Sequence, residues 1–176
     1  MLNLAVILED TARNFPNHPA FTFGETVLNY AQINGAANQV AHGLRAAGLQ
    51  PGDKVALSCL NLPYFPILYY GILKAGCVVV PLSVLLKTDE IAYHLQDSDA
   101  KAYFCFEGTA ELPMGAMGQA GFHQAEQCEH FFLIMPQLDQ PASIEGAQTL
   151  GQLMQDQPGT LESHASAAED TCVIVY

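Results

Sequence analysis

The most constraining feature of this sequence is the alternation of short apolar runs with helical segments between residues 51 and 106. The apolar runs span residues 55–59, 77–81 and 101–106. Continuous apolar strands separated by helices are typical of a parallel sheet that is buried on both faces. The sequence therefore predicts an α/β fold with a mostly parallel sheet flanked by helices. Sheets of this kind usually bind small ligands beyond the carboxyl ends of their strands.

The first 50 residues predict a helix, a small β-hairpin and a second helix. Residues 21–23 and 26–28 flank Gly24-Glu25, which suits a hairpin turn. Asn29 then predicts the start of the second helix, with Gln32 at the position of a capping box, and Gly48 predicts its end. The first helix, within residues 2–15, places its apolar side chains on one face, which comprises Leu4, Ile7, Leu8 and Ala12.

Two further helices are predicted to begin at Asn61 and Thr88, because both side chains can cap a helix N-terminus. Gly76 is predicted to end the first of them. Beyond Phe106 the pattern weakens, and residues 107–170 form an acidic, weakly patterned region. The elements expected there and after it are a helix at 115–128, a strand at 131–135, a short helix at 149–155 and a buried strand at 171–176. All are assigned to one domain, residues 1–176.

The charge of the chain excludes several classes of partner. The formal net charge is −12, and all six basic residues precede position 102. A nucleic-acid binder needs clustered Lys and Arg to neutralise phosphates, and an acidic membrane surface would repel this chain. Ten of the eighteen acidic residues lie between Glu107 and Asp170, which indicates a solvated acidic surface. An anionic ligand is expected to meet the first 106 residues.

The cysteines and the N-terminus indicate a reducing compartment. The five cysteines are an odd number without close pairs, which argues against a disulfide framework. The N-terminus lacks the basic start of a signal peptide. Residues 68–86 are largely apolar, but Lys74, Gly76 and Pro81 interrupt them, so a core helix followed by a strand is expected. The sequence therefore predicts a cytoplasmic protein without a transmembrane segment.

Residues that could carry chemistry are scarce. The joints after residues 59 and 81 lack glycine, and no phosphate-binding glycine motif occurs. Ser58 and Ser83 follow strands, but no nucleophile elbow or base partner accompanies them. His123, Cys128 and His130 form the single His–Cys cluster, and their spacing fits no familiar zinc pattern. The sequence therefore predicts no catalytic residue and no metal ligand in this chain.

Five segments of the sequence carry a family resemblance: LNYAQIN at 28–34, GLQPGDKVAL at 48–57, NLPYF at 61–65, YGILKAGCVVVPL at 70–82 and EIAYHLQDS at 90–98. Taken together, they resemble the amino-terminal part of the adenylate-forming (AMP-binding) enzymes. Within that superfamily the resemblance is closest to AMP-forming long- and medium-chain fatty acyl-CoA ligases. It is strong over residues 20–106 and returns at residues 170–176.

The resemblance implies an ATP- and Mg²⁺-dependent reaction. Such enzymes convert a carboxylate into an acyl-adenylate and pass the acyl group to coenzyme A. In them a strand like residues 171–176 runs into the loop that grips the ATP phosphates, so this chain is expected to be an inactive amino-terminal fragment of the adenylation domain. Some relatives place a basic residue after the VVP strand, where it touches a coenzyme A phosphate. Here Val84, Leu85 and Leu86 fill that loop, and Lys87 is the nearest cation.

Two alternatives stay open at this point. One is a non-catalytic α/β domain that binds a partner or a small ligand. The other is an adenylation domain with a different acyl acceptor, as in acyl-AMP ligases or peptide synthetases. We also expect a homodimer or aggregation of this fragment, because residues 173–175 are predicted to lie at an unprotected sheet edge.

Overall fold

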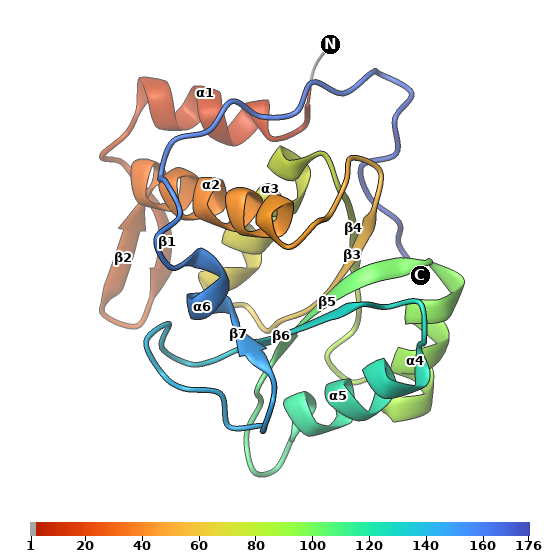
Figure 1. The fold of residues 1–176 in the computed structure, drawn as a ribbon. Helices are drawn as coiled ribbons and strands as arrows, with labels where there is room; N and C mark the ends of the chain where they lie inside the picture. The colour runs from red at the N-terminus through yellow and green to blue at the C-terminus, as the bar shows by residue number, and fades with distance from the viewer. Residues whose placement is uncertain (1–2) are drawn as a thin grey trace. The chain divides into compact units, whose positions relative to one another are not determined.

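The computed structural model describes residues 3–176, which divide into two units. Figure 1 shows their elements in chain order. Unit 1 comprises the residues up to Gly52 together with Asn61–Val78 and Met154–Cys172. Unit 2 comprises Asp53–Leu60, Val79–Leu153 and Val173–Tyr176.

Unit 2 is built on a five-stranded parallel sheet, which confirms the predicted α/β fold. The strand order is β4-β3-β5-β6-β7, so β3, β5 and β6 are interior strands. Their side chains are almost all buried, as expected where both faces of a sheet are covered. The strands are β3 (Lys54–Ser58), β4 (Val78–Pro81), β5 (Ala100–Phe106), β6 (His130–Ile134) and β7 (Gln148–Thr149).

Two helices, α4 (Thr88–Asp97) and α5 (Met114–Gln124), lie side by side against this sheet (Figure 1). α5 approaches β5 closely at Gly118, where an added Cβ would lie 2.6 Å from the Cys105 Sγ. The short helix α6 (Leu150–Met154) follows the edge strand β7. The predicted elements at 115–128, 131–135 and 149–155 are therefore found as α5, β6 and α6.

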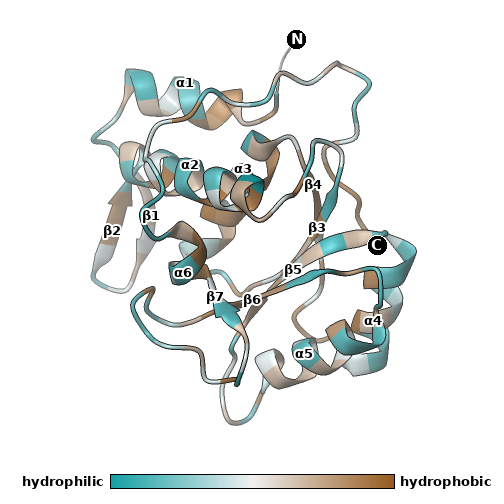
Figure 2. Cartoon of the chain, viewed as in Figure 1, coloured by the Kyte–Doolittle hydropathy of each residue, from teal (hydrophilic) through white to brown (hydrophobic). Residues whose placement is uncertain are grey.

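Unit 1 packs two helices against each other beside a hairpin. α2 and α3 meet at Gly71, where an added Cβ would lie 2.6 Å from the Val40 Cβ. Figure 2 shows hydrophilic and hydrophobic residues alternating along α1 and α2, as amphipathic helices require. The elements are α1 (Val6–Asn14), β1 (Pro19–Phe23), β2 (Thr26–Asn29), α2 (Tyr30–Ala46) and α3 (Tyr64–Ala75).

The local signals at α2 and at the end of α3 are confirmed. Asn29 Oδ1 accepts a hydrogen bond from the Gln32 backbone N–H at 2.9 Å. Gln32 Oε1 accepts one from the Asn29 N–H at 2.9 Å, which completes the capping box. Gly76 caps α3 with φ +91°, the left-handed conformation that glycine adopts without strain.

The predicted starts of α3 and α4 are wrong by one to two residues. Pro63 is the N-cap of α3, and Asn61 lies before it. Lys87 is the N-cap of α4, and Thr88 is already helical. The Thr88 hydroxyl donates to the Met117 carbonyl at 3.5 Å instead of capping its own helix. Tertiary contact with α5 therefore replaces the local cap.

The apolar face predicted for the first helix is only partly buried. Leu8 and Ala12 are buried, whereas Ile7 is 55% exposed. Leu4 precedes α1 and is also exposed, and Leu2 lies outside the described residues. Unit 1 thus leaves part of this apolar stripe in contact with solvent.

The end of the chain does not form the expected buried strand. Val173 makes one parallel bridge to Val79, and the Ile174 N–H donates to the Val79 carbonyl at 2.9 Å. Val175 is 74% exposed. β4 is an edge strand, so this short segment pairs with its open side.

Residues 157–164 cross unit 1 without regular secondary structure and are tied to it by side chains. The amides of Asn38 and Gln39 donate to the carbonyls of Gly159 and Gln157, at 2.8 and 3.1 Å. His42 Nε2 lies 2.9 Å from the Thr160 carbonyl oxygen. One polar face of α2 therefore holds this segment, which we call the 157–164 segment.

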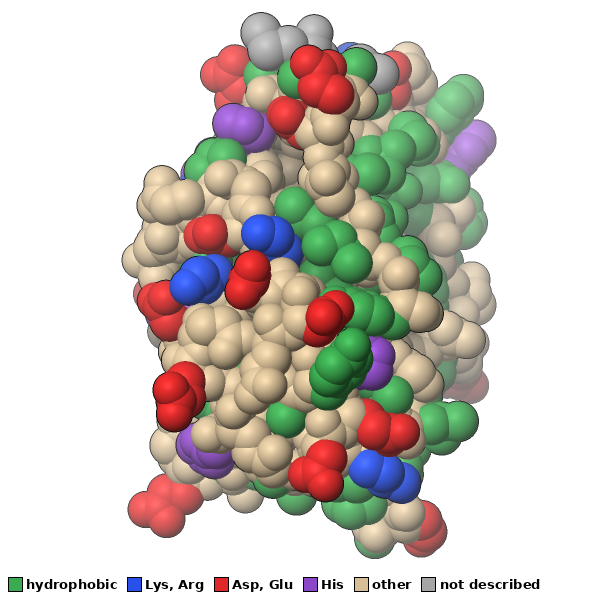
Figure 3. Space-filling model, turned by 90° about the vertical axis from the view of Figure 1, so that its right-hand side faces the viewer, with side chains coloured by type: hydrophobic (Ala, Val, Ile, Leu, Met, Phe, Trp, Pro, Cys, Tyr) green, Lys and Arg blue, Asp and Glu red, His purple; other side chains and the backbone are tan. Residues whose placement is uncertain are grey.

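The acidic surface and the course of the apolar stretch at residues 68–86 agree with two further expectations. Figure 3 shows acidic side chains scattered over one face of the molecule rather than gathered into one patch. No helix within residues 3–176 is long and apolar enough to cross a membrane. The apolar stretch at residues 68–86 is divided between α3 and β4, as predicted.

Candidate functional site

A ligand site is expected beyond the carboxyl ends of the strands of the unit 2 sheet. We call this side of the sheet its carboxyl edge. β3, β5 and β6 end together at Ser58, Phe106 and Ile134, because they are paired in parallel. The joint that follows β4 reaches the same edge, since the Leu82 N–H donates to the Leu57 carbonyl at 2.9 Å. This edge therefore brings Ser58 and Ser83 together, and Lys87 lies further along the joint, at the N-cap of α4.

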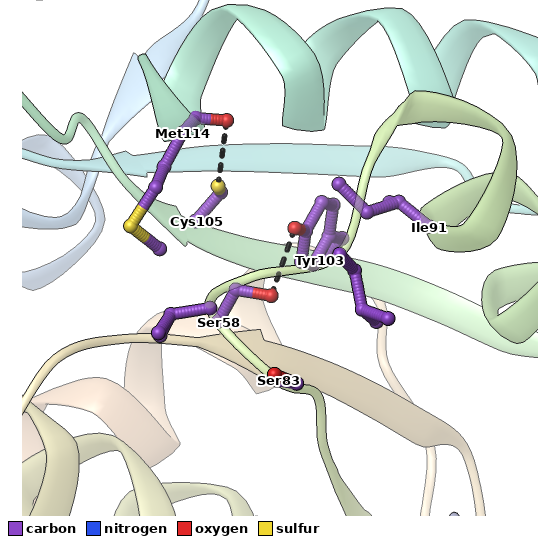
Figure 4. A pocket seen from close by; sticks show the side chains of 8 residues that line it. Ser58, Ser83, Ile91, Tyr103, Cys105 and Met114 are labelled. Atoms are coloured by element: carbon purple, nitrogen blue, oxygen red, sulfur yellow. Dashed lines mark hydrogen bonds between the residues drawn. The ribbon is translucent and has the colours of Figure 1, made fainter. Parts of the chain in front are cut away.

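A small hollow lies at this edge, and two of the side chains that line it share a hydrogen bond (Figure 4). The Tyr103 hydroxyl donates to the Ser58 Oγ at 2.9 Å. The hollow measures about 10 Å³, which is room for roughly one water molecule. Its lining residues are Ser58, Ser83, Val84, Leu86, Ile91, Tyr103, Cys105 and Met114.

The groups around this hollow are held in their neutral forms. Burial raises the pKa of the Tyr103 hydroxyl well above its ordinary value, and the neighbouring Cys105 raises it further. Burial also raises the pKa of the Cys59 and Cys105 thiols to about 12. A thiol is a nucleophile only as the thiolate, so these cysteines are inert at neutral pH. The Tyr103–Ser58 hydrogen bond links β3 and β5 at the carboxyl edge of the sheet and supplies no activated nucleophile.

Lys87 lies at the surface where the joint meets α4. Its backbone N–H donates to Glu90 Oε2 at 2.8 Å, which helps to close the first turn of the helix. Its side chain is exposed, and its ammonium forms no ion pair within residues 3–176. Asp89 and Glu90 lie in the first turn of α4, after Thr88. The predicted contact of Lys87 with a coenzyme A phosphate stays a prediction.

Two of the three residues of the predicted His–Cys cluster line a hollow of about 400 Å³ beside β6. His123 and His130 line this hollow, whereas Cys128 is buried and its thiol contacts the His130 carbonyl at 3.9 Å. Among residues 3–176, no three His, Cys, Asp or Glu side chains are placed to hold a metal ion together. These residues are therefore not brought together as a ligand set.

Sequence reasoning missed a buried charged cluster in unit 1. The Lys74 side chain is only 1% exposed, and its Nζ lies 2.5 Å from Glu9 Oε1. The Ser163 hydroxyl donates to the same oxygen at 2.5 Å. The signal available in the sequence was a single lysine within the apolar segment YGILKAG. Nothing in the sequence indicated that Glu9, 65 residues away, would be the partner of this lysine.

For both Lys74 and Glu9, burial and ion pairing shift the pKa in opposite directions. Burial lowers the pKa of Lys74, and the carboxylate of Glu9 raises it only in part. Burial would raise the pKa of Glu9, but the hydrogen bonds from Lys74 and Ser163 and the charge of Lys74 lower it overall. Glu9 therefore remains ionised at neutral pH and keeps the ammonium compensated.

Comparison with known proteins assigns the fold to a family of enzymes. A family model described as "AMP-binding enzyme" matches residues 8–176. The fatty acid–acyl-carrier-protein ligase ScoC of Streptomyces coeruleorubidus is 36% identical over 93 residues, which are 53% of this chain and 18% of that protein. The long-chain-fatty-acid–CoA ligase FadD13 of Mycobacterium tuberculosis is 37% identical over 103 residues, or 57% of this chain and 20% of that protein.

A solved structure extends the likeness over nearly the whole chain. The anthranilate CoA ligase AuaEII, in complex with anthranoyl-AMP, superposes with a TM-score of 0.86 at 26% identity. The match covers 98% of this chain and 31% of that one. This chain thus spans about a fifth of the two curated relatives and less than a third of the solved one.

Proposed function

Because this chain belongs to the AMP-binding enzyme family, we propose that the protein takes part in AMP-forming activation of a fatty acid as its CoA thioester. In that reaction the carboxylate attacks the α-phosphate of ATP and pyrophosphate leaves. The thiol of coenzyme A then attacks the acyl carbonyl, and AMP leaves. The family match over residues 8–176 carries this proposal.

The residues of this chain do not fit ATP by themselves. The hollow at the carboxyl edge holds about one water molecule, and apolar side chains form most of its lining. No glycine-rich loop follows the strands at this edge within the described residues. We therefore derive no step through ATP or Mg²⁺ from these side chains, and assign the sheet a supporting role.

Lys87 fits a contact with a phosphate group of coenzyme A. Its ammonium is exposed and can donate up to three hydrogen bonds to phosphate oxygens. It also stands at the start of α4, where the positive end of the helix favours an anion. Asp89 and Glu90 oppose this attraction in part, so Lys87 would supply one contact of a larger site.

A different acyl acceptor is the second candidate function. The name of the relative ScoC specifies an acyl-carrier protein as the acceptor, and the similarity to it covers about as much of this chain as the similarity to FadD13. The activation step is the same in both cases, so the acceptor separates the candidates. A purely non-catalytic binding domain is the remaining alternative.

The test follows pyrophosphate exchange and thioester formation by the whole gene product. We expect ATP–pyrophosphate exchange that depends on a fatty acid, followed by CoA thioester formation. Residues 1–176 alone are expected to give no exchange. A whole product without exchange for any fatty acid would contradict the proposal, and transfer only to a carrier protein would favour the second candidate.

The assay of CoA thioester formation also tests the proposed contact between Lys87 and coenzyme A. We expect Lys87→Ala to raise the KM for coenzyme A about three- to tenfold, the loss of one charge-assisted hydrogen bond, and to leave exchange unchanged. Lys54→Ala is the matched control, because Lys54 lies at the opposite end of β3. Equal effects of the two substitutions would remove Lys87 from the site.

The proposal also covers the cellular compartment of the protein and its assembly into a homodimer. All five cysteines are free, which supports a reducing compartment such as the cytoplasm. The exposed Val175, beside the edge strand β4, supports pairing of residues 1–176 by themselves with a second copy. Light scattering over a range of concentrations tests this, and a monomer throughout would exclude the dimer.

A further inference from the structure

The hollow of about 400 Å³ beside β6 lies within unit 2, at the opposite end of the strands from the carboxyl edge. It opens at the amino ends of β6 and β7, because β7 pairs with β6 only at Phe132 and Leu133. The start of β6 forms its floor, and its two sides are α5 and the residues that lead into β7. Its volume falls within the range of small-molecule sites.

Aromatic rings that solvent can reach line this hollow. The rings of Phe122 and His123, both on α5, lie 5.5 Å apart between centroids, and neither residue is buried. His130 is half-buried, and its ring stacks on that of Phe132 at 6.0 Å with nearly parallel planes. A ligand with a flat apolar body can therefore pack against these rings.

The acidic side chains at this hollow are not matched by basic ones. Glu129 and Glu145 line it and are exposed, whereas no Lys or Arg of the described residues does so. Glu145 forms no ion pair within residues 3–176. Glu129 pairs with Lys101 Nζ at 3.3 Å, but both side chains are more than a third exposed, so this pair is weak. The two carboxylates are therefore accessible to a cation from solution.

We propose that this hollow binds a small organic cation in which a short chain joins an ammonium group to an aromatic ring. The ammonium would donate hydrogen bonds to the carboxylates of Glu129 and Glu145. The ring of the ligand would pack against Phe122 and His130, and aromatic faces also attract a cation directly. The proposal uses only unit 2 and does not rest on the proposed function.

The experiment measures the binding of phenethylamine to the whole gene product by saturation-transfer NMR. We expect saturable binding with a dissociation constant below about 10 mM, a weak but specific affinity. 2-Phenylethanol, which lacks the charge, and ethylamine, which lacks the ring, are each expected to bind about fivefold more weakly. Added salt should weaken the binding of phenethylamine, because it screens exposed charges.

Substitutions locate the binding. Glu145→Gln is expected to weaken phenethylamine binding about fivefold, the loss of one attraction between unit charges in water, and to leave 2-phenylethanol unchanged. It should not lower the unfolding temperature, because Glu145 is exposed and has no ion pair to lose among residues 3–176. Glu111→Gln is the matched control and should change neither quantity. It removes the same charge from an exposed position in unit 2 that does not line the hollow.

Four outcomes would overturn the proposal. The first is the absence of saturable phenethylamine binding. The second is equal binding of 2-phenylethanol, which would show an apolar hollow that does not select a cation. The third is equal binding of ethylamine, which would show that the ring is not recognised. The fourth is an equal effect of Glu145→Gln and Glu111→Gln, which would place the ligand outside this hollow.

Discussion

Unit 1 and unit 2 bury their polar side chains by different means. In unit 2, Tyr103 and Ser58 form a neutral hydrogen bond across two adjacent strands. In unit 1, Lys74 is buried as a charge and depends on Glu9, which comes from another helix 65 residues earlier in the chain. A neutral pair loses little when it is desolvated, whereas a buried ammonium requires a compensating anion. Unit 1 is therefore the part whose stability depends on one specific long-range contact.

The largest expected effect is the loss of stability when the Lys74–Glu9 ion pair is broken. Glu9→Leu leaves the Lys74 ammonium buried without its carboxylate, and we expect it to lower the free energy of unfolding by about 3–5 kcal/mol. Glu9→Leu combined with Lys74→Met is expected to recover most of this loss, because neither charge remains. Urea unfolding measures the free energies, and hydrogen exchange should show the loss in α1 and α3 first. A loss below about 1 kcal/mol in the single variant would mean that the pair is not a structural requirement.

A smaller effect is expected where α2 and α3 approach. Gly71→Ala places a methyl group 2.6 Å from the Val40 Cβ and 3.0 Å from the Ala37 carbonyl. We expect a loss of about 1–3 kcal/mol from overpacking, measured by thermal unfolding. Gly159→Ala is the matched control in the same unit, because no atom lies within 4 Å of its added Cβ. Equal losses in both variants would point to backbone effects rather than to helix packing.

The smallest effect is expected in unit 2. Tyr103→Phe removes one neutral hydrogen bond, and the adjacent hollow can admit a water molecule to the Ser58 hydroxyl. We expect a loss of about 1 kcal/mol, and Ser58→Ala with the double variant completes a mutant cycle. Urea unfolding measures the free energies. If Tyr103→Phe lost as much stability as Glu9→Leu, the contrast between the two units would disappear.

Sequence patterns predicted the parts of the molecule that depend on neighbours in the chain. The apolar runs that became β3, β4 and β5 were recognised because a strand buried on both faces needs no polar alternation. The capping box at Asn29 was recognised because its two partners are three residues apart. Lys87 was located correctly in the joint before α4, although its proposed contact awaits a test.

Features that join distant parts of the chain were not predicted. The 157–164 segment has no apolar or polar period of its own, and side chains of α2 about 120 residues earlier hold its carbonyl groups. Thr88 was expected to be a cap, but contact with α5 redirected its hydroxyl. In each case the partner that decides the geometry lies far away in sequence.

The amino-acid sequence by itself determined the α/β class, most of the helices and strands, and the resemblance to adenylate-forming enzymes that the family match bears out. These properties follow from local periodicity, caps and turns. Only the tertiary structure decided that Lys74 is buried against Glu9 and that the hollow at the carboxyl edge is too small for a nucleotide. The reason is physical: burial and hydrogen bonding depend on which distant segments come together when the chain folds.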